Sequence, residues 1–371
     1  MEPHDEIVAA LLSVLEPLGG ELRLLGRVAD PLIGNASAKE SYLFVPDLHL
    51  ISPQRRAAFG AYGFNFEKKK LLARLLEPLA RLRETWDVMG QKKLVTIQIG
   101  DFFDLWREFG HAAKPEEIDD ETHGELRDLL YRGGFRNKPY LKATMLLGNH
   151  DTKRGVPLNE IPYTLKAMNR SSSGQPFLFA THGDAFDLME TLMPDWLSEF
   201  IVHFLGRLTP VNKYTIESWG KKSAKLNKPL GELKDFIMAP EHALGFEGEG
   251  AVKVEVGAAL PKILARRTAD PKGVTHGRFP DFYQALGDAA IQFPSCRRLR
   301  VVVVGHSHHA AMILCRPPGG GRPLLLMDVG SWIEKCSYPL DGGDVAIEPS
   351  AQLGVIHGND VRLYQVRMPQ D

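Results

Sequence analysis

The chain of 371 residues carries 45 basic and 46 acidic side chains, so a net charge of −1 counts against general attraction to nucleic acid. With 44% hydrophobic and 25% charged residues, its composition is that of a folded soluble protein rather than a disordered or membrane-spanning one. Its three cysteines are widely spaced, which argues against a disulfide framework and a cysteine zinc site.

The first part of the chain predicts a helix, a strand and a second helix. The N-terminus lacks a positively charged leader, so we expect a cytoplasmic protein. Residues 5–17 combine acidic and apolar positions at helical spacing, which predicts an amphipathic helix. Residues 42–46 form a short apolar strand that ends at Asp47-Leu48-His49. Residues 66–85 place leucines at helical spacing, and we expect Pro78 to kink or interrupt this helix.

Four further apolar strands are also followed directly by polar side chains. They are residues 94–99, 140–147, 177–181 and 300–304, and they end at Gly100-Asp101, Gly148-Asn149-His150-Asp151, His182-Gly183-Asp184 and Gly305-His306-Ser307-His308. In open α/β sheets, binding sites form outside the carboxyl ends of the strands, so these loops should converge on one edge. Later β candidates are residues 310–315, 324–329 and 352–356, and 361–366 is expected to pair with the last of these.

Two segments interrupt the alternation of strands and helices. Residues 107–137 contain an acidic stretch that we interpret as a solvated insertion. Residues 185–275 exceed the length of a normal loop and contain apolar-periodic pieces, which predicts a helical cap inserted into a single domain spanning residues 1–371. Within the cap, residues 186–208 are either a buried helix or the wall of an apolar channel or membrane-facing surface.

The polar motifs consist of residue types that bind metal ions. Imidazole and carboxylate groups suit zinc, manganese, iron and cobalt, whereas a structural zinc site would be expected to use thiolates. Alternate residues of an extended segment point the same way, so Asp47 and His49 can reach one ion, and His306 and His308 repeat this spacing. Two metals roughly 3.5–4 Å apart require a shared carboxylate, and Asp101 is the natural candidate.

In chain order the motifs read D-x-H, G-D-x-x-D, G-N-H-D, a lone histidine and G-H-x-H. This set resembles the calcineurin-like metallophosphoesterase superfamily from about residue 40 to residue 335, excluding the insertions. The resemblance implies a four-layer α/β/β/α sandwich with two mixed sheets packed face to face. It also implies two divalent metal ions and hydrolysis by a hydroxide between them; we expect manganese first, with iron, zinc and cobalt as alternatives.

The resemblance further implies a role for each motif residue. The metal ligands would be Asp47, His49 and His308 for one ion, Asn149, His182 and His306 for the other, and Asp101 as the bridge. His150 would lie near the phosphate, where it stabilises charge or protonates the leaving oxygen. Asp104 and Asp151 would either orient these histidines or cap the helices that follow them.

Several substrate classes remain open. The segments D-L-H-L, G-D-F-F-D-L-W and T-H-G-D, with a basic insertion after the last, resemble the UDP-2,3-diacylglucosamine hydrolase family of lipid A pyrophosphatases. His150 stands where that family has arginine, and it fits a phosphomonoesterase or protein phosphatase. A nuclease or cyclic-nucleotide phosphodiesterase is a third candidate class, and a non-catalytic scaffold is a fourth. We expect a phosphorylated small molecule or nucleotide-linked substrate rather than nucleic acid, and peripheral membrane contact through the cap stays open.

Overall fold

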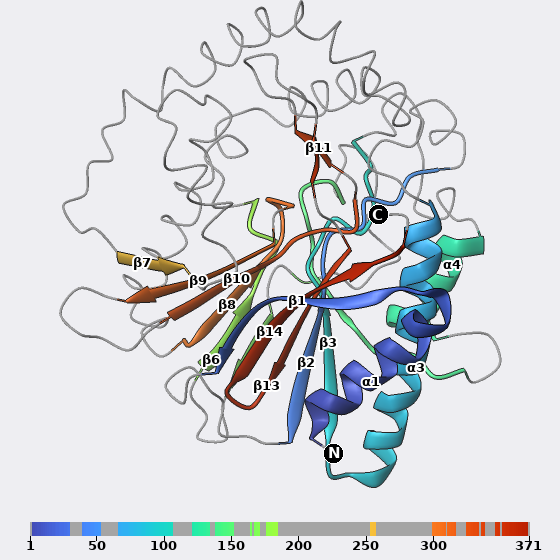
Figure 1. The fold of residues 1–371 in the computed structure, drawn as a ribbon, viewed down its shortest axis with the longest axis horizontal. Coiled ribbons are helices and arrows are strands. Elements are labelled where there is room, and N and C mark those ends of the chain that lie inside the picture. The colour runs from blue at the N-terminus through green and yellow to red at the C-terminus, as the bar shows by residue number, and fades with distance from the viewer. Residues whose placement is uncertain are drawn as a thin grey trace, which may run out of the picture.

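The computed structural model shows a mixed α/β protein with two six-stranded mixed sheets (Figure 1). The residues it describes are 2–29, 39–52, 66–106, 121–133, 138–151, 164, 167–170, 176–184, 253–256, 299–308, 310–316, 324–333, 335–337, 346–348 and 351–369. None of the helices in these ranges is long and apolar enough to span a membrane.

The first sheet has the strand order β1-β14-β13-β2-β3-β4. Its strands are β1 (Glu21–Ala29), β2 (Glu40–Val45), β3 (Lys93–Gln98), β4 (Thr144–Met145), β13 (Gln352–His357) and β14 (Asp360–Arg367). Strands β2, β3 and β4 run parallel, so their carboxyl ends lie at the same edge. Strands β13 and β14 form the antiparallel pair that the sequence predicts.

The second sheet has the order β5-β6-β8-β10-β9-β7. Its strands are β5 (Ala167–Arg170), β6 (Pro176–Ala180), β7 (Lys253–Val256), β8 (Val301–Val304), β9 (Ala310–Arg316) and β10 (Leu324–Val329). Strands β6, β8 and β10 are parallel, and β5, β7 and β9 pair antiparallel to their neighbours. Two short strands, β11 (Lys335–Ser337) and β12 (Ala346–Glu348), form a separate pair.

The helices gather on one face of the first sheet (Figure 1). They are α1 (Pro3–Leu15), with a 3-10 turn at Glu16–Leu18, α3 (Phe66–Met89), and α4 (Glu121–Arg127), which continues into a π-helical turn at Asp128–Arg132. The predicted N-terminal helix is therefore confirmed. Helix α3 continues past Pro78, so of the two expected effects of the proline the interruption does not occur; buried leucines hold the helix against the sheet on both sides of it.

Alternation along β2 produces two cores. Leu43 and Val45 pack with the helices, while Tyr42 and Phe44 pack with the second sheet. Gly354 of β13 leaves room for the approach of β10, since a Cβ there would lie 3.0 Å from atoms of Met327 and Val329. The described residues therefore form three layers: helices, first sheet and second sheet.

The structure corrects two expectations about the insertions and strands. Residues 121–132 are not a solvated insertion, because they form the α4 helical segment and bury Leu126 and Leu130 in the core. The strand expected at 140–147 is reduced to β4, since Lys142 has a φ of 49° that breaks the extended backbone.

The expected cap falls almost entirely outside the described residues. Within 185–275, residues 253–256 form β7, which pairs with β9 at the edge of the second sheet. Of the acidic insertion, residues 107–120 and 134–137 also lie outside the described part.

Candidate metal centre

Five strand-end loops bring the predicted site residues together. Asp47 and His49 follow β2, Asp101 follows β3, and Asn149 with His150 follows β4. The second sheet contributes His182 after β6, and His306 with His308 after β8. The loops therefore come from the carboxyl ends of parallel strands in both sheets, as the sequence predicts.

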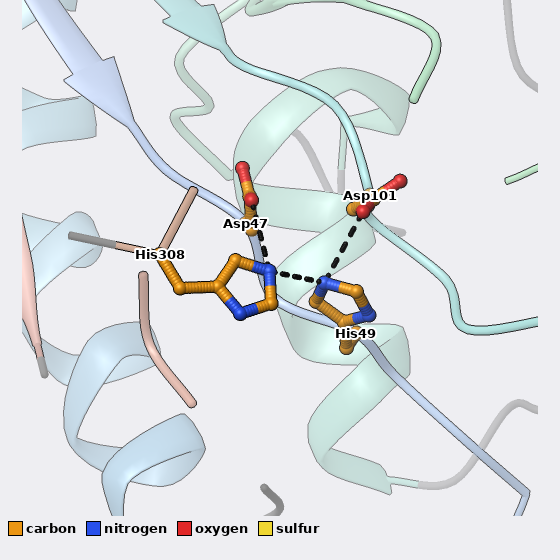
Figure 2. A group of neighbouring side chains, drawn as sticks. All are labelled: Asp47, His49, Asp101 and His308. Atoms are coloured by element: carbon orange, nitrogen blue, oxygen red, sulfur yellow. Dashed lines mark hydrogen bonds and ion pairs between the residues drawn. The ribbon is translucent and has the colours of Figure 1, made fainter. Parts of the chain in front are cut away.

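One group of ligand atoms consists of Asp47, His49, Asp101 and His308, and these atoms all lie within 4.8 Å of one another. Figure 2 shows the two histidine rings side by side, with the Asp47 carboxylate next to His308 and the Asp101 carboxylate next to His49. His308 Nε2 lies 3.3 Å from Asp47 Oδ2 and 3.0 Å from His49 Nε2, which lies 3.2 Å from Asp101 Oδ2. This buried group of imidazoles and carboxylates can hold a divalent metal ion.

A second group adjoins the first through Asp101. His182 Nε2 lies 3.3 Å from Asp101 Oδ2 and 3.0 Å from Asn149 Oδ1. The His306 ring lies edge-on to the His182 ring, with centroids 5.1 Å apart. One carboxylate oxygen of Asp101 thus lies within ion-pair distance of histidines on both sides.

The backbone at the ligands is left-handed. The φ angles are 48° at His49, 47° at Asp101, 66° at His306 and 60° at His308. Residues other than glycine adopt this region uncommonly, and such conformations cluster at functional sites. The expectation that the D-x-H and H-x-H pairs converge because their backbone is extended is therefore wrong, since His49, His306 and His308 all have left-handed backbone.

The glycines that precede the ligands make room for neighbouring ligands. A Cβ at Gly148 would overlap Asp101 Oδ1, and a Cβ at Gly305 would overlap Asp47 Oδ1. A Cβ at Gly100 would lie 2.7 Å from His182 Nδ1. Each glycine thus lets one loop approach the ligand of another.

Burial and mutual charge shift the pKa values of the central groups. Burial raises the pKa of Asp47 to about 7, against the effect of His182. Burial lowers the pKa of His49, but Asp101 and Asp104 outweigh it and raise the pKa to about 9. The histidines around Asp101 hold its pKa well below the usual range despite burial. Burial and the charges of the neighbouring groups thus act against each other at each of these side chains.

The residues fit a divalent cation. Asp47 Oδ1 is buried and accepts no hydrogen bond from the described part of the chain. A buried carboxylate oxygen without a hydrogen bond is costly, and a bound cation would satisfy it. Imidazole, carboxylate and amide oxygen ligands together match manganese, iron, zinc and cobalt.

Asp104 connects a proposed ligand to His150. Its Oδ2 lies 3.2 Å from His49 Nδ1, and its Oδ1 lies 2.9 Å from His150 Nδ1. The Trp106 ring stacks on the His150 ring, with centroids 4.3 Å apart and an interplanar angle of 25°. Asp104 therefore orients two histidines, which agrees with the first of its two expected roles.

Asp151 supports the loops through the main chain. It accepts hydrogen bonds from the N–H groups of Phe103, at 2.8 Å, and Gly148, at 3.0 Å. These bonds tie the loop after β3 to the loop after β4. Asp151 thereby places the backbone on which Asn149 and His150 lie.

Sequence reasoning missed Lys69, which is buried beneath the loop after β2. It stands in a run of three lysines, where nothing distinguishes it from its partly exposed neighbours except the helical period of the apolar residues. It also missed the Ser307 hydroxyl, which donates to Asp328 Oδ2 at 2.5 Å and holds the loop between His306 and His308.

The site is thus a buried cluster of aspartates and histidines that can hold divalent metal ions. No protein-family model matches this chain, and no curated protein matches it.

Proposed function

We propose that the chain is a dinuclear metal-dependent phosphoesterase of the calcineurin-like type, built as a four-layer α/β/β/α sandwich. The observation that carries this proposal is the position of Asp101. Its Oδ2 lies 3.2 Å from His49 Nε2 and 3.3 Å from His182 Nε2, so a single carboxylate oxygen faces ligand groups on both sides. A bridging ligand between two metal ions requires this arrangement.

The ligands divide into two sets. One ion would be held by Asp47, His49 and His308. The other ion would be held by Asn149, His182 and His306. Asp101 would bind both ions. When bound, the ions would supply Lewis acidity toward a phosphoryl oxygen and lower the pKa of the attacking water. Two ions suit phosphoryl transfer because negative charge accumulates on the phosphoryl oxygens.

His150 would act on the leaving group. Its Nδ1 faces Asp104 at 2.9 Å, which leaves Nε2 as the atom that can donate a proton. As the bond from phosphorus to the leaving oxygen breaks, that proton would neutralise the oxygen. The His150 side chain is 14% exposed, so it is less deeply buried than Asp104 and accessible to a substrate.

This proton donor favours an ester substrate over an anhydride. An alkoxide leaving group is strongly basic and needs a proton, whereas a phosphate leaving group is already stable as an anion. We therefore place a phosphate ester of a small molecule or nucleotide first, and a lipid A type pyrophosphate second. A helical cap within residues 185–275, apart from strand β7, and a cytoplasmic location complete the proposal.

Metal-dependent hydrolysis tests the proposal. The purified chain is treated with a chelator, reconstituted with Mn²⁺, and assayed with p-nitrophenyl phosphate, its bis ester and a nucleotide-sugar diphosphate. We expect hydrolysis of at least one ester only after reconstitution, and its loss in Asp101→Asn. Asp360→Asn is a matched control, because Asp360 contributes no ligand and pairs with Arg27 of β1 and Arg362 of β14.

No hydrolysis of any of the three compounds with manganese, iron, zinc or cobalt would overturn the proposal. Hydrolysis of the diphosphate alone would favour a lipid A type pyrophosphate over an ester.

A further inference from the structure

Lys69 is a buried ammonium group beneath the metal-ligand loop. It lies in the first turns of α3, and only 2% of its surface is exposed. Nζ donates hydrogen bonds to the carbonyl oxygens of Leu48 and of Trp332, the latter at 3.0 Å. A lysine is rarely buried this fully, because removing an ammonium group from water is costly.

One acceptor belongs to the metal-ligand loop after β2, and the other belongs to the turn after β10 that is bonded to this loop. Leu48 lies between the proposed ligands Asp47 and His49. Trp332 follows β10, and its N–H donates to the carbonyl of Asp47 at 2.9 Å, next to an isolated bridge between Asp47 and Ser331. Lys69 therefore connects helix α3 to both the ligand loop and the turn that supports it.

The peptide group between Leu48 and His49 is held at both ends. Its carbonyl accepts from Lys69, and its N–H donates to the Asp101 carbonyl at 2.8 Å. The orientation of this peptide plane determines the φ of His49, which is 48°. Since that conformation is unfavourable for histidine, the surrounding bonds must maintain it.

We propose that Lys69 is a positioning residue for the metal centre, which holds the Leu48–His49 peptide in the orientation that aims His49 at the metal ions. This inference rests on the proposed function, because it assumes that His49 is a ligand. Burial also lowers the pKa of Lys69 to about 7, although Asp47 opposes the shift. The amine keeps its two hydrogen bonds to carbonyls at the expense of its own solvation.

Metal affinity of the full chain tests the proposal. Lys69→Met keeps the length of the side chain and removes the donor. We expect its Mn²⁺ affinity, measured by calorimetric titration, to fall about 10- to 100-fold, which is the usual loss when a group that orients a ligand is removed. Lys68→Met and Lys70→Met are matched controls on the same helical turn, where both lysines are partly exposed, and should stay within about twofold of the wild type.

Hydrogen exchange distinguishes a local effect of Lys69 on the ligand loop from an effect on the stability of the whole fold. It also provides a test if Lys69→Met folds poorly. In the metal-free chain, Lys69→Gln should speed exchange at the amides of Leu48 and His49, whereas the exchange rates of the α3 amides should stay unchanged. Unchanged exchange at these two amides, or Mn²⁺ affinity of a folded Lys69→Met chain within twofold of the wild type, would overturn the inference. A wild-type chain that binds no divalent ion would overturn the proposed function as well.

Discussion

At the residue scale, the close approach of the loops explains why the motifs contain glycine. Gly148 has no positive φ, so its requirement is steric: a Cβ there would overlap Asp101 Oδ1. Gly100 combines both reasons, with a φ of 101° and the His182 ring beside it. The proposed bridging carboxylate is thus placed by residues that bind no metal themselves.

Gly148→Ala should displace the Asp101 carboxylate and lower Mn²⁺ affinity at least about tenfold, because ligand geometry is lost. Gly90→Ala is the control, since nothing lies within 4 Å of a Cβ there, and the strain of alanine at its φ of 67° falls directly after α3, where no ligand lies. Calorimetric titration of both variants tests this. Equal affinities in the two variants would show that Asp101 does not depend on this close approach.

His150→Gln should reduce hydrolysis of an alkyl phosphate by about 10²- to 10⁴-fold, the usual contribution of a general acid. The p-nitrophenyl ester should be affected much less, since its leaving group needs no proton. Steady-state kcat for both esters, with metal content measured in parallel, tests this. An equal loss on both esters would contradict a role in protonation.

Metal affinity should rise with pH between about 6.5 and 9. Burial lowers the pKa of His49, but Asp101 and Asp104 raise it to about 9, so a metal ion must displace a proton at neutral pH. The protonated His49 ring stabilises the metal-free fold. This stabilisation is complete below about pH 6.5 and is lost as the pH rises through 9. Affinity should therefore increase by about tenfold per pH unit for each proton released. Calorimetry at pH 6.5, 7.5 and 8.5 tests this, and a flat profile would contradict it.

At the element scale, helix α3 serves both the core and the site. Its leucines pack on the first sheet, and Lys69 reaches the loop after β2. Helix α1 packs beside it, where Glu6 accepts from Trp86 Nε1 at 2.8 Å and pairs with Lys92 at 2.6 Å. The periodicity of both helices is visible in the sequence, whereas the inward orientation of one lysine among three depends on tertiary packing.

Leu11→Ala on α1 should lower the free energy of unfolding by about 2–5 kcal/mol, because Leu11 is fully buried and its loss leaves a cavity. Mn²⁺ affinity should stay unchanged, since α1 contributes no ligand. Val88→Ala on α3 is the control, with 84% of Val88 exposed, and should change stability little. Denaturant unfolding with calorimetry checks both results, and comparable destabilisation by the two changes would contradict the packing.

At the scale of the whole molecule, the candidate site depends on both sheets. Asp47, His49 and Asp101 come from the first sheet, and His182, His306 and His308 come from the second. Their convergence is predictable, because parallel strands align their carboxyl ends and polar residues follow each strand. The left-handed turns are not predictable from spacing, because they depend on contacts between loops that are distant in the chain.

Strand β1 and the short length of β4 also cannot be predicted from the local sequence pattern. β1 is a half-exposed edge strand without clear alternation, and it forms by pairing with β14 near the other end of the chain. β4 is short because the positive φ of Lys142 ends the extended backbone. In these cases a distant partner or a local turn outweighs the apolar pattern.

The number of metal ions bound per chain tests the central claim most directly. Equilibrium dialysis of the chelator-treated protein against Mn²⁺, with metal analysis of the retained chain, should give two ions per wild-type chain. Asp101→Asn should lose at least one of them, because the bridging charge is removed. Retention of no manganese, or of one ion regardless of Asp101, would contradict a dinuclear centre bridged by this carboxylate.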